Sequence, residues 1–391
     1  MKKSQSFESA GLPGRTTTDL SMREKNQGPH RCRESAFSYI AVERVYFSER
    51  RSLLRLLFMA VVLHGPLRLG VLEMSRRTAV RLVIRRCQRR LGWLELECIS
   101  LPKNGDICIR VHRGFKLFDF HAKTVTRFFH SDVSDEQVIA EITAAETAAN
   151  LGFAPRVLRA DRKERFYTEQ YVRGDLGYTT SSGHRGTFIA EHKEEIVSCL
   201  RDLLLLKPRR SVPLSTHLNS IMETLPLQRM RDSGVVDEKI EEIRRFMEEI
   251  TASAMAVDHP VNLVFSHGDF SLVNFIEAPA GLCVIDWEGA DYRTPLFDLH
   301  NLFMTELYYK RAQSGVVTEV NQMIDALASK LQDNDAPLAH SLLSSREMLR
   351  RIYYAERVSM LLSRELSSHQ IAVTLRSIAV FRDYETMVSS I

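Results

Sequence analysis

Residues 265–303 read FSHGDFSLVNFIEAPAGLCVIDWEGADYRTPLFDLHNLF, and this stretch is the most informative part of the chain. It contains two His, four Asp and two Asn between short hydrophobic segments. The first polar unit is His267-Gly268-Asp269, and Asn274 follows five residues after Asp269. Phosphoryl transfer requires a group that orients and deprotonates a hydroxyl, and oxygen ligands that hold Mg²⁺ against nucleotide phosphates. Asp269 suits the first task, and a short loop can turn the amide oxygen of Asn274 back toward the same site.

The second polar unit begins at Asp286, directly after the apolar run 282–285. Such a run predicts a buried strand. A carboxylate at the end of this strand is well placed to hold Mg²⁺, and its charge is tolerated there because a cation pairs with it. Asp298 lies in a third unit, PLFDL, which opens a helical segment.

The order and spacing of these units resemble those of the aminoglycoside phosphotransferase and choline kinase superfamily. Its pattern is HGDxxxxN, then a strand ending in D-W/F-E, then P-x-x-D-L at the start of a helix; this chain has HGDFSLVN, VIDWEGA and PLFDL. The resemblance implies an α+β, protein-kinase-like fold over about residues 95–391, with ATP and Mg²⁺ as cofactors. We therefore predict a small β-rich N-lobe over 93–172 and a large helical C-lobe, with the catalytic loop, over 173–391.

The resemblance also implies roles for individual residues. Asp269 would be the catalytic base, and Asn274 and Asp286 would be the Mg²⁺ ligands. His267 would hold the catalytic loop, and Asp298 would brace that loop through hydrogen bonds to its backbone. Trp287 and Glu288 would support the metal-binding segment.

The same segment also allows a metal-dependent phosphohydrolase, because His and Asp side chains suit Zn²⁺, Mn²⁺ or Fe. In that alternative His267, Asp269, Asp286 and His300 form one cluster. The sequence has no HExxH unit and no adjacent His-Asp pair in this segment, and Asn274 would have no role.

The predicted N-lobe begins where the pattern alternates with a period of two. No GxGxxG phosphate loop is present among its predicted strands. A helix is expected over 132–150, with a last strand over 166–172 that leads into a linker at Arg173 and Gly174. The four strands predicted before the helix are Leu94–Leu101, Ile107–His112, Lys116–Phe120 and Thr124–Phe129.

The superfamily expects a strand Lys that contacts the ATP phosphates and pairs with a helix Glu. Arg127 stands where that Lys is expected, Lys116 and Lys123 are nearby alternatives, and Glu141 is the best partner on the helix. Arg presents a planar fork and Lys a compact charge, so the exchange is not neutral. This departure leaves open a kinase-fold binding or regulatory protein that transfers no phosphate. The linker would be the hinge, where backbone groups around Glu169–Tyr171 would hydrogen-bond adenine.

The first ninety residues differ in composition from the remainder. Residues 1–35 are polar and predict disorder, and 51–90 contain ten Arg but only one acid, Glu73. We interpret 1–92 as a basic, partly disordered extension. A helix expected over 75–91 would either pack on the N-lobe or lie on an anionic membrane. A third alternative is that translation begins at Met74.

These features predict an ATP- and Mg²⁺-dependent phosphotransferase acting on a hydroxyl of a small molecule, saccharide or glycoconjugate. The six Cys show no paired spacing, which indicates a reduced cytoplasmic protein. The basic stretch 51–90 allows a peripheral contact with an anionic membrane at its inner face. A protein kinase is disfavoured, because the eleven residues between Asp286 and Asp298 leave no room for an activation segment. No nucleic-acid partner is expected. The C-terminal helices mix Arg with Glu, which does not indicate a strongly cationic acceptor.

Overall fold

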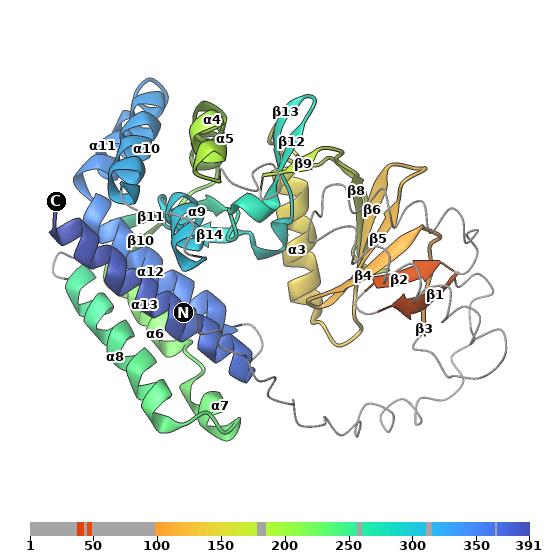
Figure 1. The fold of residues 1–391 in the computed structure, drawn as a ribbon, viewed down its shortest axis with the longest axis horizontal. Helices are drawn as coiled ribbons and strands as arrows, with labels where there is room; N and C mark the ends of the chain where they lie inside the picture. The colour runs from red at the N-terminus through yellow and green to blue at the C-terminus, as the bar shows by residue number, and fades with distance from the viewer. Residues whose placement is uncertain are drawn as a thin grey trace, which may run out of the picture.

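The structure of the 391-residue chain is a computed structural model, and it describes residues 37–42, 45–48, 98–177, 185–255, 260–309, 315–363 and 366–391 (Figure 1). The helix expected over 75–91, the disorder expected over 1–35 and the whole basic stretch 51–90 lie outside these residues. The described chain forms a β-rich N-lobe and a helical C-lobe, which confirms the expected α+β, two-lobed architecture.

An eight-stranded antiparallel sheet makes up most of the N-lobe, in the order β3-β1-β2-β4-β5-β6-β8-β7. The four strands expected before the helix are present as β3 to β6, and the expected last strand is β8. Two strands from the predicted extension also belong to the sheet, because β1 pairs with β3 and β2 pairs with β4. The strands are β1 (Phe37–Val42), β2 (Val45–Ser48), β3 (Cys98–Leu101), β4 (Ile107–Val111), β5 (Gly114–Asp119), β6 (Thr124–Phe129), β7 (Val157–Asp161) and β8 (Phe166–Gln170).

Helix α3 (Asp135–Ala148) follows β6 and lies between the two lobes in Figure 1. The Ser134 side chain accepts a hydrogen bond from the Gln137 backbone N–H; this contact caps the helix and places its start at Asp135. Its buried stripe contains the apolar residues Val138, Ile142 and Ala145. Glu141 is buried on the same helix.

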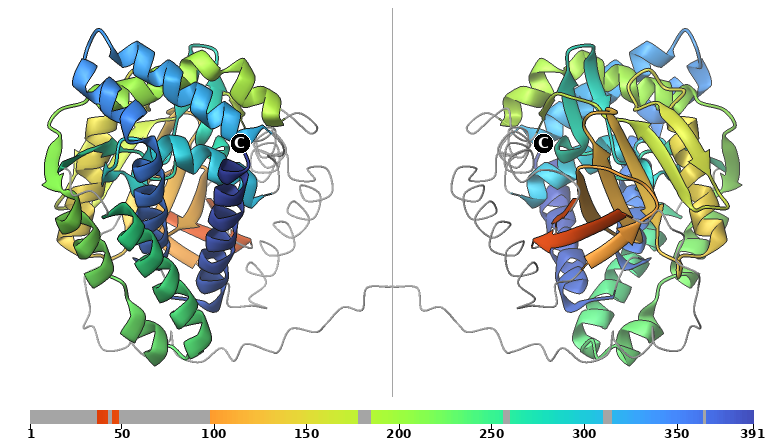
Figure 2. Two further views of the ribbon diagram at one scale, coloured as in Figure 1. Left: turned by 90° about the vertical axis from the view of Figure 1, so that its left-hand side faces the viewer. Right: turned by 90° about the vertical axis from the view of Figure 1, so that its right-hand side faces the viewer.

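Helices build most of the C-lobe and enclose the largest hydrophobic core of the described residues (Figure 2). His192 separates the first two helices of this lobe, α4 and α5. The helices are α4 (Arg185–Glu191), α5 (Lys193–Leu205), α6 (Leu214–Glu223), α7 (Leu227–Asp232), α8 (Asp237–Ala254), α9 (Phe297–Tyr308), α10 (Val316–Leu331), α11 (Ala336–Ser344), α12 (Arg346–Ser363) and α13 (Ser368–Ser389).

Two small sheets carry the loops of the 265–303 stretch. One has the order β10-β11-β14 and the other β13-β12-β9. Their strands are β9 (Asp175–Leu176), β10 (Arg210–Pro213), β11 (Pro260–Ser266), β12 (Phe275–Ala278), β13 (Gly281–Val284) and β14 (Asp291–Arg293). The apolar run before Asp286 is therefore a buried strand, as expected.

Among the described residues, no helix has the length and apolar character that a membrane span requires.

Candidate active site

The loop after β11 is fixed by a buried carboxylate from the start of α9. Asp298 Oδ2 accepts the His267 N–H at 2.8 Å, and Asp298 Oδ1 accepts the Gly268 N–H at 3.0 Å. Gly268 has a φ of 80°, and a Cβ there would lie 2.1 Å from the Gly289 carbonyl oxygen. Only glycine fits this close approach. The bracing predicted for Asp298 is present in these contacts, although its part in an activity remains a prediction.

His267 connects the two polar units through both of its ring nitrogens. Its Nδ1 accepts the Asp269 N–H at 3.1 Å, and its Nε2 lies 2.9 Å from the Ile285 carbonyl oxygen. A carbonyl can only accept, so Nε2 carries the proton and the ring is the neutral Nε2–H tautomer. The ring also packs against Trp287, with centroids 4.5 Å apart. His267 therefore holds Asp269 in register with the segment that contains Asp286.

Asp269 and Asn274 lie next to each other in the loop between β11 and β12. The Asn274 Nδ2 donates to the Asp269 carbonyl oxygen at 2.8 Å and lies 3.4 Å from Asp269 Oδ2. Because the amide nitrogen faces Asp269, the amide oxygen is the atom of Asn274 that suits a cation. The Asp269 side chain is 36% exposed, so its carboxylate can reach an incoming hydroxyl.

Asp286 stands immediately after β13 in a left-handed conformation, with φ 71° and ψ 59°. Such a conformation is costly for residues other than Gly, and it concentrates at functional sites. The Ile285 N–H donates to the Asn274 carbonyl oxygen at 2.9 Å, which brings the two polar units together. The Lys116 Nζ donates to Asp286 Oδ1 at 2.7 Å. The carboxylate thus accepts a cation at this position.

The donor set fits a Mg²⁺ ion held jointly by the protein and a nucleotide. Among the described residues, no group of three or more His, Cys, Asp or Glu could hold a metal on its own. Mg²⁺ at such sites commonly takes one or two protein oxygen ligands and completes its shell with phosphates and water. Asp286 and the amide oxygen of Asn274 provide that number and type of ligand.

Charges around Asp286 alter the pKa values of its neighbours. Burial alone would raise the pKa of Asp286, but the adjacent Lys116 holds it below its usual range. Burial would lower the pKa of Lys116, but Asp286, Glu288 and Glu169 together raise it. Burial raises the pKa of Glu169 to about 7, against the opposing effect of Lys116. Lys116 is therefore a firmly charged ammonium group in an acidic cleft.

Arg127 forms the predicted pair with the helix. Its Nε donates to Glu141 Oε1 at 2.9 Å, its Nη2 donates to the His112 carbonyl oxygen at 2.6 Å, and Nη2 lies 3.5 Å from Glu288 Oε2. Only 1% of the Arg127 side chain is exposed, compared with 15% for Lys116. The guanidinium group is therefore buried, and Lys116 is the more accessible cation.

Lys116 and Arg127 face each other across β5 and β6, where they are paired in register. Directly opposed residues on neighbouring strands point to the same face of a sheet. The two cations therefore lie side by side on one face of the sheet. Sequence reasoning placed Arg127 ahead of Lys116 as the phosphate contact, and which of them contacts a nucleotide stays a prediction. Lys123, the third cation considered, is exposed in the turn between the two strands and contacts neither Asp286 nor Glu141 in any described interaction.

The hinge contains both backbone bonds and aromatic side chains. The N–H groups of Gln170 and Tyr171 already donate to the Arg156 and Lys123 carbonyl oxygens, each at 2.9 Å. These two N–H groups are thus already bonded within the protein. That other backbone groups of Glu169–Tyr171 hydrogen-bond adenine stays a prediction. The Tyr171 ring meets the Phe120 ring edge to face, with centroids 5.2 Å apart.

Near the loop, Arg357 had no role assigned from the sequence, and His300 had one only in the phosphohydrolase alternative. Arg357 on α12 places Nη2 3.8 Å from Asp269 Oδ1 and Nη1 3.5 Å from the Gly268 carbonyl oxygen. His300 is buried, and neither of its ring nitrogens has a hydrogen-bond partner among the described residues. Arg357 lies 88 residues after Asp269 in the sequence, so no local pattern indicated the contact.

The metal cluster of the phosphohydrolase alternative is not supported by these contacts. Both nitrogens of His267 are occupied by backbone groups. His300 packs against Tyr353, with ring centroids 5.5 Å apart, and burial lowers its pKa to about 3.

The model of the phosphotransferase enzyme family (APH) matches residues 118–323, just over half of the chain. The chain belongs to this family. It is accordingly a phosphotransferase of the kinase type with an alcohol group as acceptor. No curated protein sequence matches the chain.

Solved structures of similar fold include kinases that act on several small molecules. A choline kinase from Streptococcus pneumoniae is 14% identical, with 77% of this chain and 99% of that chain covered and a TM-score of 0.45. An aminoglycoside phosphotransferase from Streptomyces rimosus is 15% identical, with coverage of 70% and 92% and a TM-score of 0.36. A glucosamine kinase in complex with glucosamine, ADP and inorganic phosphate is 14% identical, with coverage of 71% and 80% and a TM-score of 0.47.

Proposed function

We propose that this family member transfers phosphate from ATP, with Mg²⁺, to a hydroxyl group of a small molecule, saccharide or glycoconjugate. The observation that carries the proposal is the meeting of Asp269, Asn274 and Asp286 at adjoining loops, with Lys116 on Asp286. A carboxylate base, two oxygen ligands and a compact cation are the groups that positioning and charge stabilisation of a phosphoryl group require.

Each residue has one role in this proposal. Asp269 orients the acceptor hydroxyl and accepts its proton. Asn274 and Asp286 would hold Mg²⁺, which when bound neutralises charge on the ATP phosphates. Lys116 contacts the phosphates, and the hinge at Glu169–Tyr171 holds the adenine.

Arg127 acts indirectly in the proposal. Its buried pair with Glu141 joins β6 to α3, and its approach to Glu288 joins both to the segment after Asp286. Arg127 therefore positions the sheet and the helix around the cleft, while the neighbouring Lys116 supplies the phosphate contact.

Replacement of the base tests the chemistry. Asp269→Asn keeps the size of the side chain but removes its capacity to accept a proton. We expect phosphoryl transfer to fall by about 10²–10⁴-fold, with Mg²⁺-ATP binding largely retained. The assay is ADP release with panels of sugars, amino sugars, choline-like amines and lipid-linked glycans, together with calorimetric titration of ATP.

The matched control is Asp291→Asn, which alters an exposed Asp in the same stretch. Its side chain bonds only the adjacent Tyr292 N–H among the described contacts. Full turnover in Asp269→Asn would overturn the assignment of the base. ATP binding without turnover on any panel member would favour the non-transferring alternative.

We retain a cytoplasmic location and a peripheral contact of residues 51–90 with anionic membranes as a further part of the proposal. Its support is the Arg-rich composition of that segment. Sedimentation with anionic vesicles should decrease as salt increases, since charge attraction at a surface is screened over about 8–10 Å at physiological ionic strength. Sedimentation with neutral vesicles at the same level would contradict this contact.

A further inference from the structure

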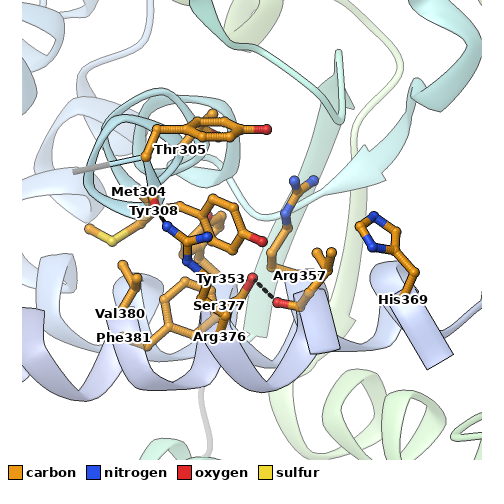
Figure 3. A pocket seen from close by; sticks show the side chains of 12 residues that line it. Met304, Thr305, Tyr308, Tyr353, Arg357, His369, Arg376, Ser377, Val380 and Phe381 are labelled. Atoms are coloured by element: carbon orange, nitrogen blue, oxygen red, sulfur yellow. Dashed lines mark hydrogen bonds between the residues drawn. The ribbon is translucent and has the colours of Figure 1, made fainter. Parts of the chain in front are cut away.

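A cavity of about 350 Å³ opens between α9, α12 and α13, beside the catalytic loop (Figure 3). Its volume lies within the range of small-molecule sites. The lining positions on α13 include His369, Val373, Arg376 and Val380, whose spacing places them on one face of the helix. Helices α9 and α12 supply the opposite walls.

The charged side chains that line the cavity are basic. Arg357, Arg376 and His369 line the cavity, and none of its twelve lining residues is Asp or Glu. A site for a cationic acceptor would require carboxylates, because a buried or half-buried cation needs an opposite charge. The cavity therefore has the polarity that suits an anion.

Arg376 is held in place by its neighbours on α9. Its Nη2 donates to the Tyr308 carbonyl oxygen at 2.7 Å, and its guanidinium carbon lies 4.3 Å from the centroid of the Tyr308 ring. A guanidinium group has five N–H donors, so one bond to the backbone leaves donors for a ligand. The fixed orientation lowers the entropic cost of binding an anion there.

Arg357 connects the cavity with the proposed base. It lines the cavity, and its Nη2 lies 3.8 Å from Asp269 Oδ1. A molecule that places a hydroxyl at Asp269 would therefore bring its neighbouring substituents next to this guanidinium group. Tyr308, Tyr353 and Phe381 form the apolar part of the wall and present rings to the body of such a molecule.

From this arrangement we propose that the acceptor is a small anionic alcohol, with a phosphate or carboxylate group held by Arg357 and Arg376. This inference rests on the proposed function, since it assigns the substrate class of the same site. A sugar that already carries a phosphate or an acidic group meets the requirement. Choline-like amines and aminoglycosides do not.

The test uses four probes of similar size that differ in charge. The full chain, saturated with Mg²⁺ and a non-hydrolysable ATP analogue to occupy the nucleotide site, is titrated calorimetrically with glucose 6-phosphate, glucuronate, glucose and glucosamine. We expect both anionic probes to bind at least about tenfold more tightly than glucose, which corresponds to about 1.4 kcal/mol. Glucosamine should bind most weakly. The order of the two anionic probes shows whether phosphate or carboxylate is preferred.

Arg376→Gln should weaken the binding of the anionic probes by about tenfold or more and leave glucose unchanged. Arg376 is exposed, so this substitution leaves the core intact. Arg357→Gln should have the same effect and is the second variant. The matched control is Arg382→Gln, which alters another exposed Arg of α13 that approaches Glu242 on α8 and not the cavity. It should change none of the four affinities.

The inference is overturned if neither anionic probe binds at millimolar concentration, if glucose or glucosamine binds as tightly as both of them, or if Arg382→Gln acts like Arg376→Gln. Failure of the proposed function gives a different result. In that case the chain would prefer anionic sugars through Arg357 and Arg376 but would consume ATP with none of them. Turnover of glucosamine that is insensitive to Arg376→Gln would uphold the kinase and overturn the acceptor class.

Discussion

The two cations that face each other on β5 and β6 are predicted to have separable roles. Lys116→Ala removes the ammonium group that lies 2.7 Å from Asp286, on a side chain that is 15% exposed. A charge-assisted hydrogen bond contributes about 1.5–3 kcal/mol. With 1.36 kcal/mol for each factor of ten, the affinity for Mg²⁺-ATP should fall by about 10- to 150-fold. Unfolding by urea should change less than in Arg127→Ala, since the Asp286 side chain is 34% exposed whereas that of Glu141, the partner of Arg127, is 4% exposed.

Arg127→Ala should have the opposite profile. It leaves Glu141, which is almost fully buried, without its cation. Removing one partner of a buried ion pair costs about 3–5 kcal/mol, a large share of a typical folding free energy. Arg127→Lys should recover only part of this loss, because an ammonium group cannot reproduce the separate bonds of Nε to Glu141 and Nη2 to the His112 carbonyl.

Two measurements separate these roles. Calorimetric titration with Mg²⁺-ATP gives the affinity, and urea titration followed by circular dichroism gives the free energy of unfolding. Lys123→Gln, an exposed Lys in the turn between the same strands, is the control and should change the affinity little. The reasoning is refuted if Lys116→Ala binds ATP like the wild type while Arg127→Ala remains fully stable and loses ATP affinity.

Three further predictions follow from the same region and from the sheet. Burial raises the pKa of Glu169 to about 7, so the folded state prefers the neutral form, and ionising Glu169 destabilises it as the pH rises from about 4.5 to 7. Glu169→Gln should therefore raise Tm relative to wild type more at pH 8 than at pH 5. An equal shift of Tm at both pH values would contradict this origin. Gly268→Ala should lose more than about 1–2 kcal/mol of stability and most activity, because its Cβ would lie 2.1 Å from the Gly289 carbonyl oxygen and its φ is 80°. A variant whose loop is unmoved in a crystal structure and whose urea midpoint equals that of the wild type would argue against this clash. A chain that begins at Met74 lacks β1 and β2, which pair with β3 and β4, so it should unfold at lower urea than the full chain; an unchanged midpoint would show that these strands do not stabilise the sheet.

Local patterns predicted the two lobes because burial periodicity acts over a few residues. The alternation over 94–129 predicted β3 to β6, and the apolar run 282–285 predicted the strand before Asp286. Strand β7 was not predicted, because VLRAD alternates over too few residues and carries two charged side chains. Strands β1 and β2 were assigned to an extension because their partners lie far along the chain: β1 pairs with β3 and β2 pairs with β4. A sequence pattern does not show which strand another one pairs with.

The amino-acid sequence by itself determined the chemistry of the loops. His267, Asp269, Asn274, Asp286 and Asp298 lie within 32 residues, so their order and spacing could be recognised, and the structure brings them together through backbone bonds over that short separation.

Only the tertiary structure decided which cation serves the cleft and what the acceptor cavity contains. Lys116 and Asp286 are 170 residues apart, and Asp269 and Arg357 are 88 apart. From the sequence, Lys116, Arg127 and Lys123 were alternatives, because all three are cations of one hairpin. Packing distinguishes them: Arg127 is buried, Lys123 is exposed, and Lys116 contacts the Asp286 carboxylate. Charge on a helix likewise acquires a meaning only when neighbouring helices show which side chains share a cavity, because electrostatic attraction depends on distance in space and not on separation along the chain.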